Sequence, residues 1–192
     1  MNYGKFIKAD FILASQLKFL GKAVSTDTRW ESMNYIHVEP SEKDKDLLLG
    51  VAMDGRRLHL VDPIDNVAAK AFGLTAGYWQ LLGGGKKEVW ITRLEDSETE
   101  RFVYPNWRKV IPTSAPEYET TFSGFAFTGT SKNFPALAKF LHEFPEATAL
   151  NLEYLRDIGT GIEWRVQWIG KNSVVKFIEG DRLVLIMPMT IE

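Results

Sequence analysis

The sequence predicts an α+β fold in which helices pack on antiparallel sheets, arranged in about two domains. Apolar residues recur at helical spacing in some segments and alternate with polar residues in others. The order of one helix followed by antiparallel strands is predicted twice along the first part of the chain. The length of 192 residues is enough for one large domain or two small ones, because typical domains have about 100 to 150 residues.

The first predicted helix begins after Asp10, a residue type that caps helix N-termini. Its apolar stripe follows at the spacing i, i+4, i+7 and i+11: Leu13, Leu17, Leu20 and Val24. At about 100° per residue, Lys18 and Lys22 project from the opposite side of this helix. The pattern therefore predicts a helix that is buried on one face and basic on the other.

Strand-like segments follow at residues 35–39, 47–53 and 58–61. The pair Asp54–Gly55 separates the last two and is a strong hairpin signal. A second helix is predicted from Thr75 until the glycines that begin at Gly83. Two further strands are predicted at residues 89–94 and 101–104.

A proline-rich, polar stretch at residues 111–117 is the best candidate for a domain boundary, which predicts domains at residues 1–113 and 114–192. In the second domain, a strand at residues 122–128 precedes a helix that has Pro135 near its start. Residues 149–152 are predicted as a short strand and residues 154–158 as a helical turn. Three strands then complete the chain, at residues 162–168, where apolar residues alternate strictly, and at residues 174–178 and 183–189.

The composition excludes several classes of protein. Hydrophobic residues make up 45% and charged residues 25% of the chain, as in an ordinary globular protein. The absence of cysteine excludes disulfides, thiolate metal sites and cysteine nucleophiles, and it fits a reducing, cytoplasmic setting. No apolar run approaches the roughly 20 residues of a membrane span, and no signal-type block follows the N-terminus. We therefore expect a cytoplasmic protein that does not associate with membranes.

No catalytic or metal-binding constellation is evident. His37, His59 and His142 lack the spacing of zinc motifs, and we interpret His37 and His59 as solvent-facing or hydrogen-bonded structural residues. The run of glycines and lysines at residues 83–87 lacks the Ser or Thr of a phosphate loop and follows a predicted helix. The carboxylates at residues 95–100 fit a solvated hairpin tip. We predict a binding protein without enzymatic activity, metal or cofactor.

Three short stretches carry a resemblance to a known family. Residues 53–58, 104–112 and 185–189 resemble, in the same order, signature stretches of the bacterial replicative sliding clamp, the beta subunit of DNA polymerase III. A fourth stretch, residues 29–39, is similar to the strand that follows the first helix of the clamp's middle domain. Residues 5–113 thus resemble that middle domain, and residues 114–192 an abridged last domain; the first clamp domain has no counterpart.

The resemblance implies a hydrophobic pocket that captures short linear peptides of DNA polymerases, the clamp loader and repair proteins. In such a pocket, an apolar and adaptable floor suits an extended peptide with apolar anchors. Some positions, such as Leu58, Val110 and Ile186, can instead be core residues. The implied pocket residues are Met33, Met53, Gly55, Arg56, Arg57, Leu58, Pro105, Lys109, Val110, Leu185, Ile186, Met187, Pro188 and Met189.

The resemblance also implies association with duplex DNA without base reading. Clamp helices present lysine and arginine to the phosphates, and these contacts are loose and sensitive to salt. The matching candidates here are Lys18, Lys22, Lys86, Lys87, Lys132 and Lys139. The net charge of −2 confines any such contact to a locally basic face.

The leading hypothesis is a non-enzymatic clamp-type processivity factor, a homo-oligomer that tethers polymerase or repair partners to DNA. A second hypothesis is an accessory or decoy module that binds clamp-interaction peptides without forming a ring. A third is an unrelated α+β binding domain whose motifs match by accident. Solution mass and retention on circular DNA distinguish the first two hypotheses.

Overall fold

The computed structural model describes residues 6–9, 11–83, 89–123, 142, 149–158, 163–170 and 173–189. The chain divides into two compact units, Met1–Trp107 and Arg108–Glu192. Both contain helices and antiparallel strands, which confirms the predicted α+β class. The assignment of residues 1–113 and 114–192 to particular clamp domains stays a prediction.

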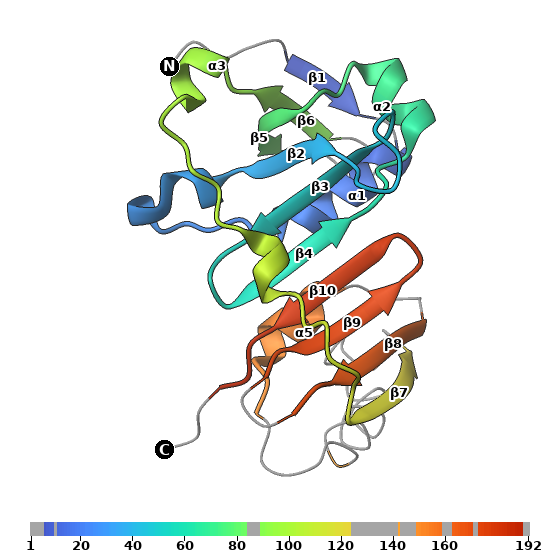
Figure 1. Ribbon diagram of the computed structural model, residues 1–192. Helices are drawn as coiled ribbons and strands as arrows, with labels where there is room; N and C mark the ends of the chain where they lie inside the picture. The colour runs from blue at the N-terminus through green and yellow to red at the C-terminus, as the bar shows by residue number, and fades with distance from the viewer. Residues whose placement is uncertain are drawn as a thin grey trace. The chain divides into compact units, whose positions relative to one another are not determined.

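The first unit is built on an antiparallel sheet with the strand order β1-β6-β5-β2-β3-β4 (Figure 1). Its strands are β1 (Phe6–Ala9), β2 (Ile36–Pro40), β3 (Leu48–Met53), β4 (Arg57–Val61), β5 (Gly77–Gly83) and β6 (Val89–Arg93). Its helices are α1 (Phe11–Gly21), the 3-10 helix η1 (Thr28–Asn34), α2 (Asn66–Phe72) and α3 (Asp96–Thr99). A further 3-10 helix, η2 (Trp107–Val110), lies where the two units join along the chain.

Helix α1 packs on one face of this sheet through the predicted apolar stripe. Leu13, Leu17 and Leu20 are fully buried, and a Cβ atom at Gly50 of β3 would lie only 2.6 Å from Leu20 Cδ1. Glycine at this position therefore allows the close approach of α1 to the sheet. Val24, predicted as the last residue of the stripe, lies beyond the end of the helix. Asp10, the predicted cap, lies outside the described residues.

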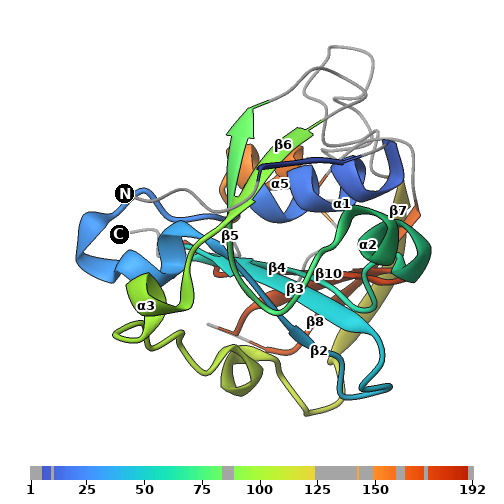
Figure 2. The ribbon, with the colours of Figure 1, turned by 90° about the horizontal axis from the view of Figure 1, so that it is seen from above.

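The two faces of the sheet carry different elements. Viewed from above, α1 and α2 lie on one side, whereas α3 and the segment after it lie on the other (Figure 2). This segment, residues 100–107, is anchored where Ser32 Oγ donates a hydrogen bond to the Val103 carbonyl at 3.0 Å. Tyr104 Oη donates a second bond, of 3.4 Å, to the Val51 carbonyl of β3. The predicted strand at residues 101–104 is thus wrong, since this segment pairs with no strand.

The predicted helix at residues 75–82 is also wrong. The helix of this region is α2, which Asp65 caps through the Ala68 amide at 2.8 Å. Gly73 ends α2 with a φ of 69°, which favours glycine. The apolar residues that follow form the central strand β5, in which Trp79 is paired with Ile36 of β2 and with a residue of β6. A short apolar run fits a buried strand as well as a helix, and the neighbouring strands decide between them.

The second unit has the strand order β10-β9-β8-β7, again antiparallel. The elements are β7 (Tyr118–Ser123), α5 (Leu152–Asp157), β8 (Glu163–Trp168), β9 (Val175–Glu179) and β10 (Arg182–Ile186). Trp164, Val166 and Trp168 of β8 are all buried, which confirms the predicted alternation. Residues 149–152 form no strand: Ala149 makes an isolated bridge to Met189, and Leu152 begins α5. The helix predicted at Pro135 lies outside the described residues.

Candidate functional site

The β3–β4 hairpin is organised by one carboxylate. Asp54 Oδ1 accepts hydrogen bonds from the backbone amides of Arg56 and Arg57, each at 3.0 Å. The other oxygen, Oδ2, accepts a bond of 2.9 Å from Arg57 Nε, within an ion pair whose two side chains are only 12% and 16% exposed. Gly55 takes a φ of 85°, a conformation that favours glycine. Local turn chemistry therefore confirms the hairpin predicted from Asp54–Gly55.

We expect replacement of Asp54 by alanine to lower the free energy of unfolding by about 1 to 3 kcal/mol, because it removes three acceptor contacts of a shielded turn. The measurement is urea denaturation followed by circular dichroism. Asp44→Ala is the matched control, since the Asp44 side chain accepts an exposed bond from the Asp46 amide at 2.9 Å and its bond from the Leu47 amide uses the backbone carbonyl. Equal losses in the two variants would contradict this role of Asp54.

The predicted pocket residues of the first unit gather partly at this hairpin. Met53 and Leu58 are directly opposite each other across β3 and β4, and both are buried. Gly55 and Arg56 are exposed at the turn. Arg57 is held by Asp54, Pro105 is half-buried in the segment after α3, and Met33 is buried in η1.

The predicted pocket residues of the second unit lie mainly at and after the end of β10. Leu185 and Ile186 are buried in this strand, which agrees with a core role for part of the predicted set. Met187 and Met189 follow it with 44% and 48% of their surface exposed, and Pro188 between them is half-buried. The Met189 amide donates a hydrogen bond to the Ala149 carbonyl at 2.8 Å. Lys109 and Val110 are exposed in η2, so Val110 is not a core residue.

The predicted pocket therefore draws on both compact units, and its assembly stays a prediction. Its exposed apolar members are Val110, Met187 and Met189. Methionine is flexible and polarisable, which suits a surface that accepts varied apolar side chains. These three side chains are the best candidates for direct contact with a peptide.

Aromatic side chains cover part of the sheet of the first unit. His37 stacks on Tyr104 with ring centroids 4.7 Å apart, and its Nε2 lies 3.0 Å from Oε2 of Glu39. Burial raises the pKa of the Tyr104 phenol well above its usual range, and the pKa of Tyr78 is raised for the same reason. These neutral phenols indicate a packing role.

The other strand histidine, His59, is fully buried, and its Nδ1 lies 2.7 Å from the Phe19 carbonyl of α1. Its ring also stacks on the Phe19 ring at 4.5 Å. These contacts join β4 to the helix that packs on it. Both His37 and His59 are thus structural residues with polar contacts, as interpreted from the sequence.

Helices α1 and α2 of the first unit, with the residue directly after α1, form a basic helix layer, whereas α3 contains Asp96 and Glu98. Lys18 of α1 is half-buried, and Lys22, directly after α1, is exposed. Sequence analysis missed Lys70, which is exposed on α2, because no helix was predicted there. The asparagine and alanines that begin α2 after Asp65 are the signal that could have found it. Neither α1 nor α2 contains an acidic residue.

The remaining lysine candidates cannot be placed. Lys86, Lys87, Lys132 and Lys139 lie outside the described residues. The run of glycines that precedes the first two follows strand β5 rather than a helix, which corrects the sequence interpretation. It is followed by strand β6, whereas a phosphate loop leads into a helix.

Residues 95–100 include helix α3 rather than a simple hairpin tip. Among the described residues, no group of three or more His, Asp or Glu side chains is arranged to hold a metal ion. No helix within the same residues is both long and apolar enough to cross a membrane.

The chain is similar to known proteins in structure but not detectably in sequence. No model of a known family and no curated protein matches the sequence. The solved DNA polymerase III subunit beta of Borrelia burgdorferi matches 99% of this chain and 65% of its own chain, with a TM-score of 0.62 and 13% identity. The sliding clamp of Bacillus subtilis gives a TM-score of 0.60 at 14% identity, covering 98% of this chain and 65% of the clamp.

The beta subunit of DNA polymerase III from Thermotoga maritima matches 100% of this chain and 67% of its own, with a TM-score of 0.59 and 14% identity. The chain thus spans about 65% of the length of the first two clamp structures. The structural matches establish the fold, whereas the identities of 13 and 14% leave the activity to be argued from the residues. On this evidence, the chain has the fold of the bacterial DNA polymerase III beta sliding clamps.

Proposed function

We propose that this protein is a non-catalytic, clamp-type processivity factor that associates with duplex DNA and tethers a polymerase or repair protein through a peptide pocket. The observation that carries the proposal is the helix layer of the first unit, where every charged side chain within α1 and α2 is a lysine. This layer lies on a fold shared with DNA sliding clamps. Because the whole chain has a net charge of −2, the positive charge of these two helices differs in sign from the chain average.

Helices α1 and α2, which carry Lys18 and Lys70, lie on one side of the sheet (Figure 2), and Lys22 directly follows α1. Phosphate contacts by lysine are independent of base sequence and release counterions. A small number of such contacts gives only a weak affinity for DNA at physiological salt. Topological linkage would hold the protein on DNA without tight binding, so the modest charge suits a sliding protein. Helix α5 carries both signs of charge, so this argument rests on the first unit.

The peptide-binding part of the proposal rests on the exposed methionines after β10 and on Val110. The Bartonella birtlesii sliding clamp, another structure with this fold, was solved bound to griselimycin, with a TM-score of 0.58. The same compound is therefore a direct probe of ligand capture by this chain. We expect saturable binding, which charged substitutions of Met187 and Met189 abolish.

The decisive experiment compares retention on circular and linearised DNA. The protein is loaded on a nicked plasmid, isolated by gel filtration and then treated with a restriction enzyme that cuts once. A clamp-type protein remains on the circle and leaves after linearisation, with a solution mass of a closed oligomer. A monomer that binds clamp-interaction peptides but shows no retention would overturn the DNA part of the proposal.

The basic helix layer gives a separate prediction. We expect Lys18→Gln, Lys22→Gln and Lys70→Gln, combined, to weaken DNA association and to reduce the slope of log K against log salt by up to about 3, since each lost phosphate contact contributes roughly 0.9. Fluorescence anisotropy with a labelled duplex measures both quantities. Lys45→Gln is the control, because exposed Lys45 lies in the loop between β2 and β3, outside the helix layer. An unchanged slope in the triple variant would remove these lysines from the interface.

A further inference from the structure

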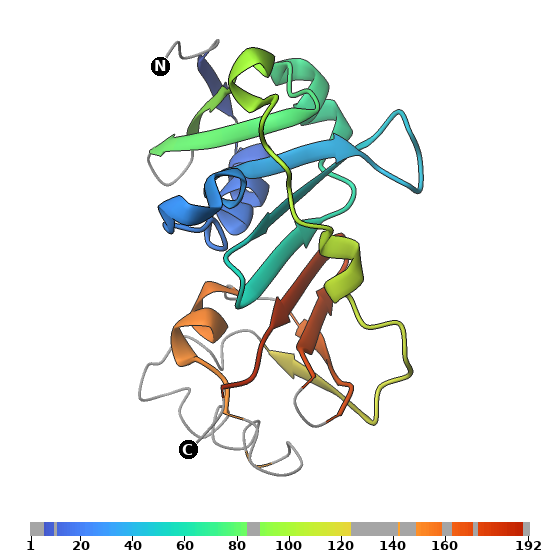
Figure 3. The same cartoon turned by 60° about the vertical axis from the view of Figure 1, so that its left-hand side comes forward.

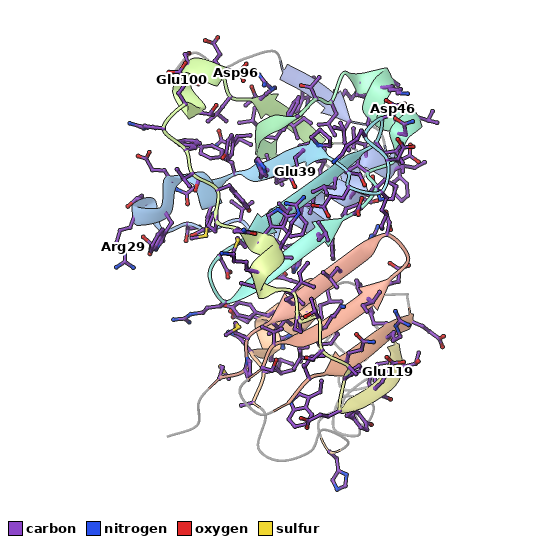
Figure 4. The ribbon with its side chains drawn as sticks, in the orientation of Figure 1. Arg29, Glu39, Asp46, Asp96, Glu100 and Glu119 are labelled. Carbon is purple, nitrogen blue, oxygen red and sulfur yellow. The ribbon has the colours of Figure 1, made fainter. Side chains whose placement is uncertain are left out.

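A cavity of about 410 Å³ lies in the first unit, between α3 and the sheet. Gln80 of β5 and Thr92 of β6 contribute from the sheet, and Glu98 and Glu100 contribute from α3 and the residue after it. Figure 3 shows α3 at the end of the sheet where β5 and β6 lie, and Figure 4 shows Glu100 beside α3. The volume is within the range of small-molecule sites, about 300 to 1,000 Å³. None of the residues predicted for peptide or DNA contact lines this cavity.

The charges around the cavity favour a cationic ligand. Each of its two arginines forms an ion pair with a carboxylate: Arg93 Nη2 lies 2.6 Å from Asp96 Oδ1, and Arg101 Nη2 lies 2.9 Å from Glu31 Oε2. Among the described residues, the carboxylates of Glu98 and Glu100 have no such counter-charge. The uncompensated charge that lines the cavity is therefore negative, and an anion would be repelled by it.

Two aromatic rings that line the cavity also favour a cationic ligand. Tyr35 and Phe102 both line the cavity, and their rings stack with centroids 5.6 Å apart. Ring faces attract ammonium and guanidinium groups within about 6 Å, with Tyr and Phe both effective. The guanidinium carbon of Arg101 lies 6.0 Å from the Phe102 centroid, at the outer limit of this range.

We propose that this cavity binds an organic cation: an ammonium or guanidinium group on a short aliphatic stem. Glu98 and Glu100 pair with the cationic group, and Tyr35 and Phe102 contact its stem and charge. The amide of Gln80 adds a polar partner from the sheet. A free amine and a basic side chain of a peptide share this chemistry. The site goes beyond the clamp-type function and requires neither DNA nor a ring.

The test is isothermal titration of the full chain with agmatine, which combines a guanidinium and an ammonium group on a four-carbon stem. We expect saturable binding that weakens at least tenfold in the double variant Glu98→Gln, Glu100→Gln. Glu95→Gln is the matched control, because Glu95 precedes α3, makes no capping hydrogen bond and does not line the cavity. Tyr35→Leu is a second variant that keeps both carboxylates, and we expect a several-fold loss from it.

A parallel titration with a Gly-Arg-Gly peptide amide distinguishes the two sources of the cation. Tighter binding of agmatine indicates a free amine, whereas tighter binding of the peptide indicates a protein partner, and both results support the site. Thermal melting of each variant establishes that it is folded. Affinity unchanged in the folded double variant, or preferential binding of butyrate over butylamine, would overturn the proposal. These outcomes are independent of DNA retention, so the two proposals fail separately.

Discussion

Replacing Met187 and Met189 together by glutamate is expected to abolish capture of a clamp-interaction peptide, with a loss of at least about 30-fold, equivalent to about 2 kcal/mol. An apolar peptide anchor cannot compensate a carboxylate that loses its water on binding. Both methionines are nearly half exposed, so the change removes little core packing. The bond from Met189 to Ala149 uses the backbone amide and survives the substitution.

Anisotropy of a labelled peptide from the clamp-binding segment of a bacterial DNA polymerase measures this effect. Val67→Glu is the control, because Val67 is an exposed apolar residue of α2, outside the predicted pocket. It introduces one negative charge, half of that in the double variant, at a side chain that is 80% exposed. Wild-type affinity in a folded double methionine variant would show that these residues do not form the peptide site, and equal losses in the control would indicate a charge effect of the whole chain.

Replacing Trp79 by alanine is expected to lower the free energy of unfolding by about 3 to 5 kcal/mol, a large part of the stability of a typical domain. Trp79 is only 1% exposed in the central strand β5, so its loss leaves a large cavity. Its indole Nε1 also donates a hydrogen bond of 2.8 Å to the Thr75 carbonyl, which would lose its donor.

Urea denaturation followed by circular dichroism measures the change. Trp79→Phe is the control: it keeps most of the apolar volume and removes the indole donor, so we expect a loss of about 1 to 2 kcal/mol. A loss below about 1 kcal/mol in the alanine variant would contradict the position of Trp79 in the core.

Much of the fold was predictable because its signals are local. Asp54 and Gly55 form the hairpin with hydrogen bonds that span two or three residues. The stripe of α1 and the alternation of β8 follow from the geometry of a single element. The mixed class of helices and antiparallel strands followed from these patterns together.

The candidate site was predictable only in part. Exposure separates Met187 and Met189 from the buried Leu185 and Ile186, although all four belong to one continuous apolar segment. Lys70 was missed because α2 was not predicted, even though Asp65 provides its cap. The exposure of Met187 and Met189 depends on what packs against the segment, whereas the missed helix α2 carries a local signal in its cap.

By itself, the sequence determined the hairpin at Asp54, because its hydrogen bonds join neighbouring residues. It also determined the buried faces of α1 and β8, because the geometry of a single helix or strand sets the spacing of its buried side chains. Only the tertiary structure decided that residues 77–83 form a strand, because β2 and β6 supply the backbone partners. It also brought Tyr35 and Glu98 to one cavity across more than sixty residues of chain. Such contacts depend on chain topology, which short-range patterns do not encode.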